Sequence, residues 1–174
     1  TPKKNDLAIS QDGSRVYVFS MVPTNAVHVV ETATHTVSQT VDLPGCALAY
    51  PWGNDGFTSI CADGGLANVS LKAGKADVTH TKPFFDPKKD AGFGHSPTRR
   101  PDGKTWFISS SGLVYPTSLS AESKVDAPWS IQEAAGLKKA PAAEAPFAKT
   151  WRPGGWQLSA LHYASGHLFV LMHE

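Results

Sequence analysis

The hydrophobic residues of this 174-residue chain fall into short alternating runs, and a turn dipeptide introduces several of them. In these runs a glycine preceded by Asp or Ser is followed by a segment rich in β-branched and aromatic residues. The four dipeptides are Asp12-Gly13, Asp55-Gly56, Asp102-Gly103 and Ser165-Gly166. Runs of this composition after a turn predict β-strands.

The glycines of these dipeptides recur at intervals of 43, 47 and 63 residues. Further turns and strands follow each of the first three, as over 26–31 and, more polar, over 37–43. Repeats of about 40 to 50 residues with four antiparallel strands are typical of β-propeller blades. A β-sandwich gives no reason for such a recurrence. The sequence therefore predicts an all-β fold, a β-propeller of four-stranded blades, of which the chain covers about three and a half.

One segment departs from the repeat and lengthens the third interval. Ser130 and Glu133 have the spacing of a capping box, which predicts a short helix that Gly136 or Pro141 would end. We interpret residues 1–174 as one partial propeller domain with a helical, Ala/Pro-rich insertion at about 130–150, which is solvated cover rather than a lid. Three and a half blades do not close a ring, so further blades are expected before Thr1 and after Glu174.

The two cysteines, Cys46 and Cys61, allow a geometric prediction. If 51–56 connects a hairpin, Cys46 lies opposite Cys61 and Leu48 lies opposite Ser59. Opposed residues in antiparallel strands are close enough for a disulfide. The alternative is a pair of buried free thiols. A disulfide would indicate an oxidising compartment.

Composition and motifs argue against several functions. Sixteen basic residues against fifteen acidic ones give a net charge of +1, so no basic surface for nucleic acid is expected. No apolar run approaches the roughly 20 residues that span a bilayer. The seven histidines form no HxH or HExxH motif, and Ser109–Ser111 lie in no GxSxG elbow. We therefore predict no catalytic, cofactor-binding or metal-binding residue in this chain.

The segment Thr150–Gln157, TWRPGGWQ, concentrates side chains that favour contacts. Arg152-Pro153 predicts an extended entry, and Gly154-Gly155 permits a turn before the next strand. Trp151, Arg152 and Trp156 are therefore candidates either for packing inside the propeller or for contact with another subunit, with Arg152 stacking on a tryptophan. Trp52 is a further candidate for either role.

Four segments together carry a resemblance to a known family. They are Leu43-Pro-Gly-Cys46, Ser59-Ile-Cys-Ala-Asp-Gly64, Thr79-His-Thr81 and Trp151-Arg-Pro-Gly-Gly-Trp-Gln157. The chain resembles the heavy subunit of the quinoprotein amine dehydrogenases, and is more similar to aromatic amine (aralkylamine) dehydrogenase than to methylamine dehydrogenase. The similarity covers essentially the whole chain, which corresponds to about the middle half of such a subunit.

The resemblance implies a seven-bladed periplasmic propeller with an intrachain disulfide, here Cys46 to Cys61. It implies a supporting role without a cofactor of its own. The cofactor, tryptophan tryptophylquinone, belongs to the light subunit, and two heavy chains assemble with two light chains. A light-chain aspartate takes a proton from the amine substrate, aldehyde and ammonia leave, and electrons pass to a blue copper protein, azurin or amicyanin.

A different class of function is compatible with a propeller. The chain would then belong to a stand-alone enzyme, such as a lactonase-like one, or to a binding scaffold. Such a protein would bind its ligand without a second polypeptide, whereas a heavy subunit should copurify with a small quinone-bearing chain.

Overall fold

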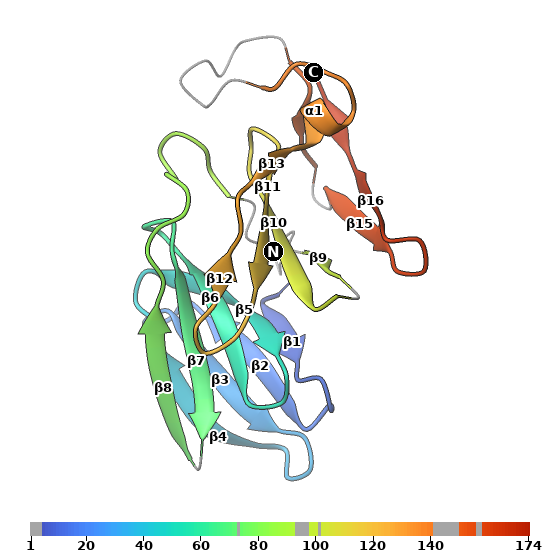
Figure 1. The fold of residues 1–174 in the computed structure, drawn as a ribbon. Coiled ribbons are helices and arrows are strands. Elements are labelled where there is room, and N and C mark those ends of the chain that lie inside the picture. The colour runs from blue at the N-terminus through green and yellow to red at the C-terminus, as the bar shows by residue number, and fades with distance from the viewer. Residues whose placement is uncertain (1–4, 73, 93–97, 101, 141–149, 156–157) are drawn as a thin grey trace. The chain divides into compact units, whose positions relative to one another are not determined.

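The computed structural model describes residues 5–72, 74–92, 98–100, 102–140, 150–155 and 158–174. The regular structure is almost entirely antiparallel β (Figure 1). The chain divides into two compact units, Thr1–Phe84 with Leu119–Lys124 and Phe85–Ser118 with Val125–Glu174. Within the described residues, no helix is long and apolar enough to cross a membrane.

The first unit contains two four-stranded sheets with neighbouring strands in chain order. One sheet comprises β1 (Leu7–Ile9), β2 (Arg15–Ser20), β3 (Ala26–Glu31) and β4 (Thr36–Asp42). The other comprises β5 (Cys46–Trp52), β6 (Gly56–Cys61), β7 (Leu66–Lys72) and β8 (Lys75–His80). This up-and-down order is the topology of a propeller blade, as the repeat predicts.

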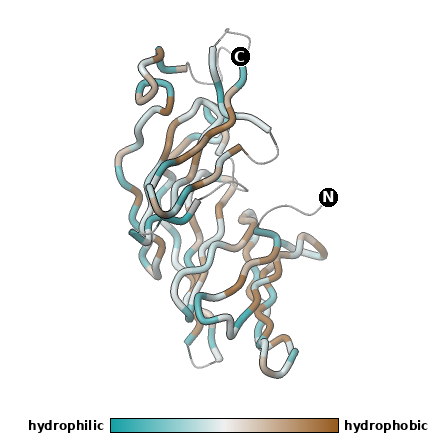
Figure 2. Tube along the Cα trace, turned by 90° about the vertical axis from the view of Figure 1, so that its right-hand side faces the viewer, coloured by the Kyte–Doolittle hydropathy of each residue, from teal (hydrophilic) through white to brown (hydrophobic). Residues whose placement is uncertain are grey.

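The core of the first unit is shared by both sheets. Alternation along β3 buries Val27 and Val29, while His28 between them turns away, and its Nδ1 lies 3.0 Å from Thr40 Oγ1. The rings of Tyr17 and Phe57, one from each sheet, lie 5.0 Å apart in the same core. Figure 2 shows hydrophobic stretches, in brown, alternating along the trace with hydrophilic ones, in teal. The two sheets are therefore stabilised by burying one face of each against the other.

Cys46 and Cys61 lie directly opposite each other on β5 and β6 and form a disulfide, so the prediction of a bridge is confirmed. Leu48 lies against Ser59 as expected, but beyond Leu48 the register is shifted by one residue. A bulge places both Leu48 and Ala49 against Ser59, whose hydroxyl donates to the Leu48 carbonyl at 2.7 Å. Leu48 adopts a φ of 66° there. β5 runs on to Trp52 and β6 begins at Gly56, so half of the expected loop at 51–56 is strand.

The second unit contains the third repeat. Its sheet has the order β12 (Lys124–Val125), β11 (Leu113–Ser118), β10 (Lys104–Ile108) and β9 (Thr98–Arg99), with β13 (Trp129–Ser130) also paired to β11. The helix α1 (Ile131–Ala134) begins where predicted, because the Ser130 hydroxyl accepts a hydrogen bond from the Glu133 backbone N–H. It ends before Gly136, at a φ of 74°. The rest of the insertion, 141–149, lies outside the described residues.

The last repeat contributes two short strand pairs. β15 (Ser159–His162) pairs with β16 (His167–Val170), and β14 (Arg152–Pro153) pairs with β17 (Met172–His173). Leu158 is fully buried and packs with Ile108 and Val114 of the neighbouring sheet. These pairs correspond to the half blade that the sequence predicts.

The position of the disulfide generates a stability prediction. Replacing both cysteines by serine in the full-length protein should lower the free energy of unfolding by about 3 kcal/mol, the chain-entropy value for a loop of this size. The shift of the urea midpoint measures it. Cys46→Ser and Cys61→Ser alone break the same bond, so each should cost as much as the pair. Additive losses would contradict this account.

Candidate subunit-contact site

Within the TWRPGGWQ segment, Arg152–Pro153 form the short strand β14, and two glycines follow it. In the β14–β17 pair, Arg152 lies opposite His173. A Cβ on Gly154 would lie 2.2 Å from the exposed His173 ring, so a side chain at 154 would displace that ring. Gly155 has a φ of 96°, as the expected turn demands. The extended entry is confirmed, and Gly155 has the positive φ that was expected; Trp156 and Gln157, through which the chain continues, lie outside the described residues.

Gln132 of α1 fixes the start of this segment. Its side chain is 1% exposed, and its amide nitrogen donates to the carbonyls of Trp151 at 2.8 Å and Ser111 at 2.9 Å. Its amide oxygen accepts from the Ser130 hydroxyl at 3.0 Å. The insertion therefore anchors Trp151 through its first helical turn. Sequence reasoning missed Gln132, since a glutamine in a short polar helix carries no signal of burial.

The candidate tryptophans differ in their surroundings. The Trp151 side chain is 46% exposed although its backbone is fixed. Trp52 is partly buried, lies over Gly56, and its indole N–H donates to the Thr58 hydroxyl at 3.1 Å. That hydroxyl donates to Asn68 at 3.0 Å. Trp52 thus packs within its own sheet, and Trp151 is the better candidate for contact with a partner.

Arg152 is partly buried in β14, beside Trp151 in sequence. A cation–π contact in this unit joins Arg100 and Trp106: the Arg100 guanidinium lies 4.3 Å from the centre of the Trp106 ring. The Trp106 ring in turn packs edge to face against the Trp129 ring, with ring centres 5.5 Å apart. No sequence pattern indicates this stack, because its members come from three separate segments.

The serine run after β10 is a structural anchor. Asp90 is buried and accepts hydrogen bonds from the hydroxyls of Ser110 and Ser111 and from the Ser111 backbone N–H. The hydroxyl oxygens of Ser111 and Ser109 also lie 3.2 Å apart. Hydroxyls that donate to a buried carboxylate in this way fix the turn that follows β10.

The carboxylates of the turns have the same role. Asp12 accepts from the Ser14 backbone N–H and from the hydroxyls of Ser10 and Ser14, and these hydrogen bonds lower its pKa to about 2. Arg15 pairs with Glu31 and Asp55, each at 3.1 Å. Burial alone would lower the pKa of Arg15, but its ion pairs raise it. Both groups hold neighbouring turns of the first unit together.

His80 lies beside the disulfide, an arrangement that the sequence did not indicate. Ligand atoms of Cys46, Cys61 and His80 all lie within 4.8 Å of one another. The two sulfurs are bonded to each other, so neither is a thiolate that could ligate a metal.

Comparison with known proteins then decides the family. The family model described as methylamine dehydrogenase heavy chain (MADH) matches residues 3–174. The chain belongs to the methylamine dehydrogenase heavy chain family. It is 27% identical over 170 residues to the methylamine dehydrogenase heavy chain of Paracoccus versutus, covering 96% of this chain and 37% of that protein. It is 30% identical over 166 residues to that of Methylorubrum extorquens, covering 94% and 38%.

Membership in the methylamine dehydrogenase heavy chain family agrees with the fold, since the sheets described above are blades of a β-propeller. The chain spans somewhat over a third of the length of these relatives, less than the half that the resemblance suggested. The candidate contact surface around Trp151 is held in place by the hydrogen bond from Gln132.

The role of Gln132 can be tested in the full-length heavy chain. Gln132→Met keeps the length of the side chain but leaves the Ser111 and Trp151 carbonyls without their donor, so unfolding should become easier by about 2–4 kcal/mol. Denaturant titration measures the loss. Gln11→Met, at an exposed position, is the matched control and should change stability by less than about 0.5 kcal/mol. Equal effects of the two substitutions would refute the anchoring role.

Proposed function

We infer that this chain is part of the heavy subunit of a quinoprotein amine dehydrogenase and supports a light subunit that carries tryptophan tryptophylquinone. The match of the heavy-chain family over residues 3–174 carries this inference. The cofactor, when bound in the light subunit, oxidises a primary amine to aldehyde and ammonia. The heavy chain positions that subunit and contributes no catalytic residue from the described segments.

The polar clusters of the described residues support a non-catalytic role. Asp90, Gln132 and Asp12 each use their side chains to fix a turn or a strand. A residue that reacts with substrate needs a group directed toward an open space, whereas each of these side chains is hydrogen-bonded to a backbone group of this chain.

Trp151 is the proposed contact residue for the light subunit. Its backbone is fixed by Gln132, so a partner would bind an indole ring of which 46% is already accessible without ordering the strand beneath it. Tryptophan is enriched among residues that dominate binding energy. Arg152, and Trp156 from its place in the sequence, belong to the same proposed surface, while Trp52 is assigned to internal packing.

The finer assignments extend this proposal. The substrate class is aromatic primary amines, supported by the resemblance of the TWRPGGWQ segment; the relatives at 27–30% identity are named for methylamine. The complete protein is a seven-bladed propeller, residues 1–174 are a partial propeller domain, and two heavy chains join two light chains. Electrons pass to a blue copper protein, azurin or amicyanin. The disulfide supports a periplasmic location, since such bonds persist in oxidising compartments.

Native mass spectrometry of the full-length protein purified from its source tests the supporting role. We expect a complex of heavy chains with a small subunit whose mass includes a crosslinked, oxygenated tryptophan pair, and a visible absorption band from the quinone. A heavy chain that shows amine dehydrogenase activity, or any ligand turnover, in the absence of a second polypeptide would favour a stand-alone propeller enzyme instead.

The contact role of Trp151 has its own test. Trp151→Ala should weaken association of the heavy and light subunits by about tenfold or more, the usual effect of removing a tryptophan hot spot. Its thermal midpoint should stay close to that of the wild type. Trp52→Ala is the matched control: it should lower the thermal midpoint and leave the affinity unchanged. The reverse pattern would assign the contact to Trp52.

A further inference from the structure

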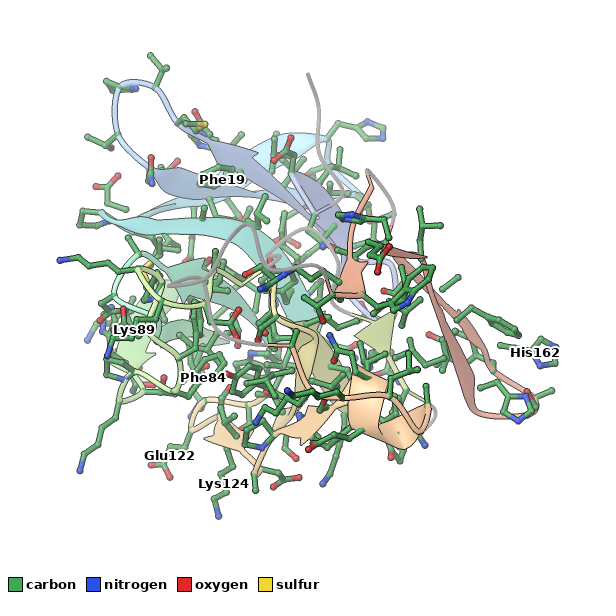
Figure 3. The ribbon with its side chains drawn as sticks, turned by 90° about the horizontal axis from the view of Figure 1, so that it is seen from above. Phe19, Phe84, Lys89, Glu122, Lys124 and His162 are labelled. Atoms are coloured by element: carbon green, nitrogen blue, oxygen red, sulfur yellow. A yellow bond between two sulfur atoms is a disulfide. The ribbon has the colours of Figure 1, made fainter. Side chains whose placement is uncertain are left out.

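The hairpin of β15 and β16 brings two histidines together. His162 ends β15 and His167 begins β16, and the two are directly opposed in the register. Opposed residues of antiparallel strands project from the same face, with Cβ atoms about 4.5–5.5 Å apart. Both side chains are exposed, and Figure 3 shows His162 at the end of this hairpin.

Both imidazoles face one atom. The hydroxyl oxygen of Ser165, in the connecting turn, lies 2.7 Å from His162 Nδ1 and 3.0 Å from His167 Nδ1. A hydroxyl has a single hydrogen, so it donates to one ring and accepts from the N–H of the other. Two ring nitrogens therefore converge on one point at the surface of the protein.

We propose that His162 and His167 form a surface site for a divalent transition-metal ion of the Cu²⁺ and Zn²⁺ class. Histidine nitrogen is the commonest protein ligand for such ions, and Cu²⁺ binds tightest in the divalent series. An ion at the position of the Ser165 hydroxyl has two imidazole ligands and leaves its other positions to water. Metal–nitrogen bonds of about 2.0–2.1 Å are shorter than the present contacts, so the two rings turn toward each other on binding.

The hairpin is already fixed in the geometry that the site needs. The Gly166 N–H donates to the His162 carbonyl at 2.9 Å, and Gly166 has the positive φ, 68°, that closes the turn. The guanidinium of Arg100 donates to the Gly166 carbonyl at 3.4 Å. Arg100 brings positive charge near the turn, but it is paired with Asp102 at 3.2 Å, which reduces its repulsion of a cation.

Sequence motifs did not reveal this pair, because four residues separate the histidines and strand motifs for metals place them two apart. Only the turn makes them neighbours. The site is independent of the proposed support of a light subunit, and each can be present without the other.

Titration of the full-length heavy chain with Cu²⁺ alone tests the proposal, with binding followed by calorimetry and by electron paramagnetic resonance. We expect a saturable site whose spectrum shows nitrogen hyperfine coupling from two imidazoles. His162→Gln and His167→Gln should each weaken that site at least tenfold and remove the two-nitrogen signature. Ser165→Ala should retain it, since the hydroxyl is displaced by the ion.

His28→Gln is the matched control. His28 also contacts a hydroxyl through Nδ1, that of Thr40, but has no second imidazole opposite it, so its loss should not change the affinity. Circular dichroism of each variant confirms that it is folded, as expected for exposed positions. The proposal is overturned if Cu²⁺ fails to bind, or if His162→Gln and His167→Gln bind it as tightly as His28→Gln.

Discussion

Burial of one sheet face against the next is the constraint on which the first unit depends. A four-stranded sheet of six- or seven-residue strands has too little material to form a core of its own. The core of this unit is instead assembled between two sheets, with the Tyr17 ring of one against the Phe57 ring of the other. This packing determines which strand faces of the two sheets are buried.

Polar residues of the first unit have the complementary task of fixing turns. The Asp12 carboxylate closes its own turn, and the Asp12 backbone N–H donates to the Asn54 side chain of the next sheet. Arg15 reaches both Glu31 in its own sheet and Asp55 beyond it. Because these groups lie at strand ends, they align neighbouring sheets without taking space from the core.

The sequence was most informative where structure is local. Asp-Gly turns, β-branched strands and the Ser130 cap depend on a few adjacent residues, and the structure has them where they were expected. The opposed cysteines were predictable from the same local symmetry. The bulge at Leu48 and Ala49 was not, because an inserted residue leaves the hydrophobic pattern nearly unchanged while shifting the pairing beyond it.

The candidate site was predictable only in part, since its supports come from distant segments. The composition of TWRPGGWQ marks it as unusual, yet nothing in it indicates that Gln132 fixes Trp151 or that the His173 ring lies over Gly154. The histidine pair at the β15–β16 turn depends on a hairpin register in the same way. Such contacts follow from tertiary structure, and single-sequence patterns do not encode them.

The disulfide has a consequence for how the β5–β6 hairpin tolerates unfolding. It joins two residues that face each other in one hairpin, rather than two separate sheets. If the sheets came apart, this covalent bond would still hold the two strand ends together. A one-residue slip, which would turn Tyr50 out of the core, is then opposed by a bond as well as by packing. The disulfide thus keeps the β5–β6 strands in register even when the neighbouring strands have separated.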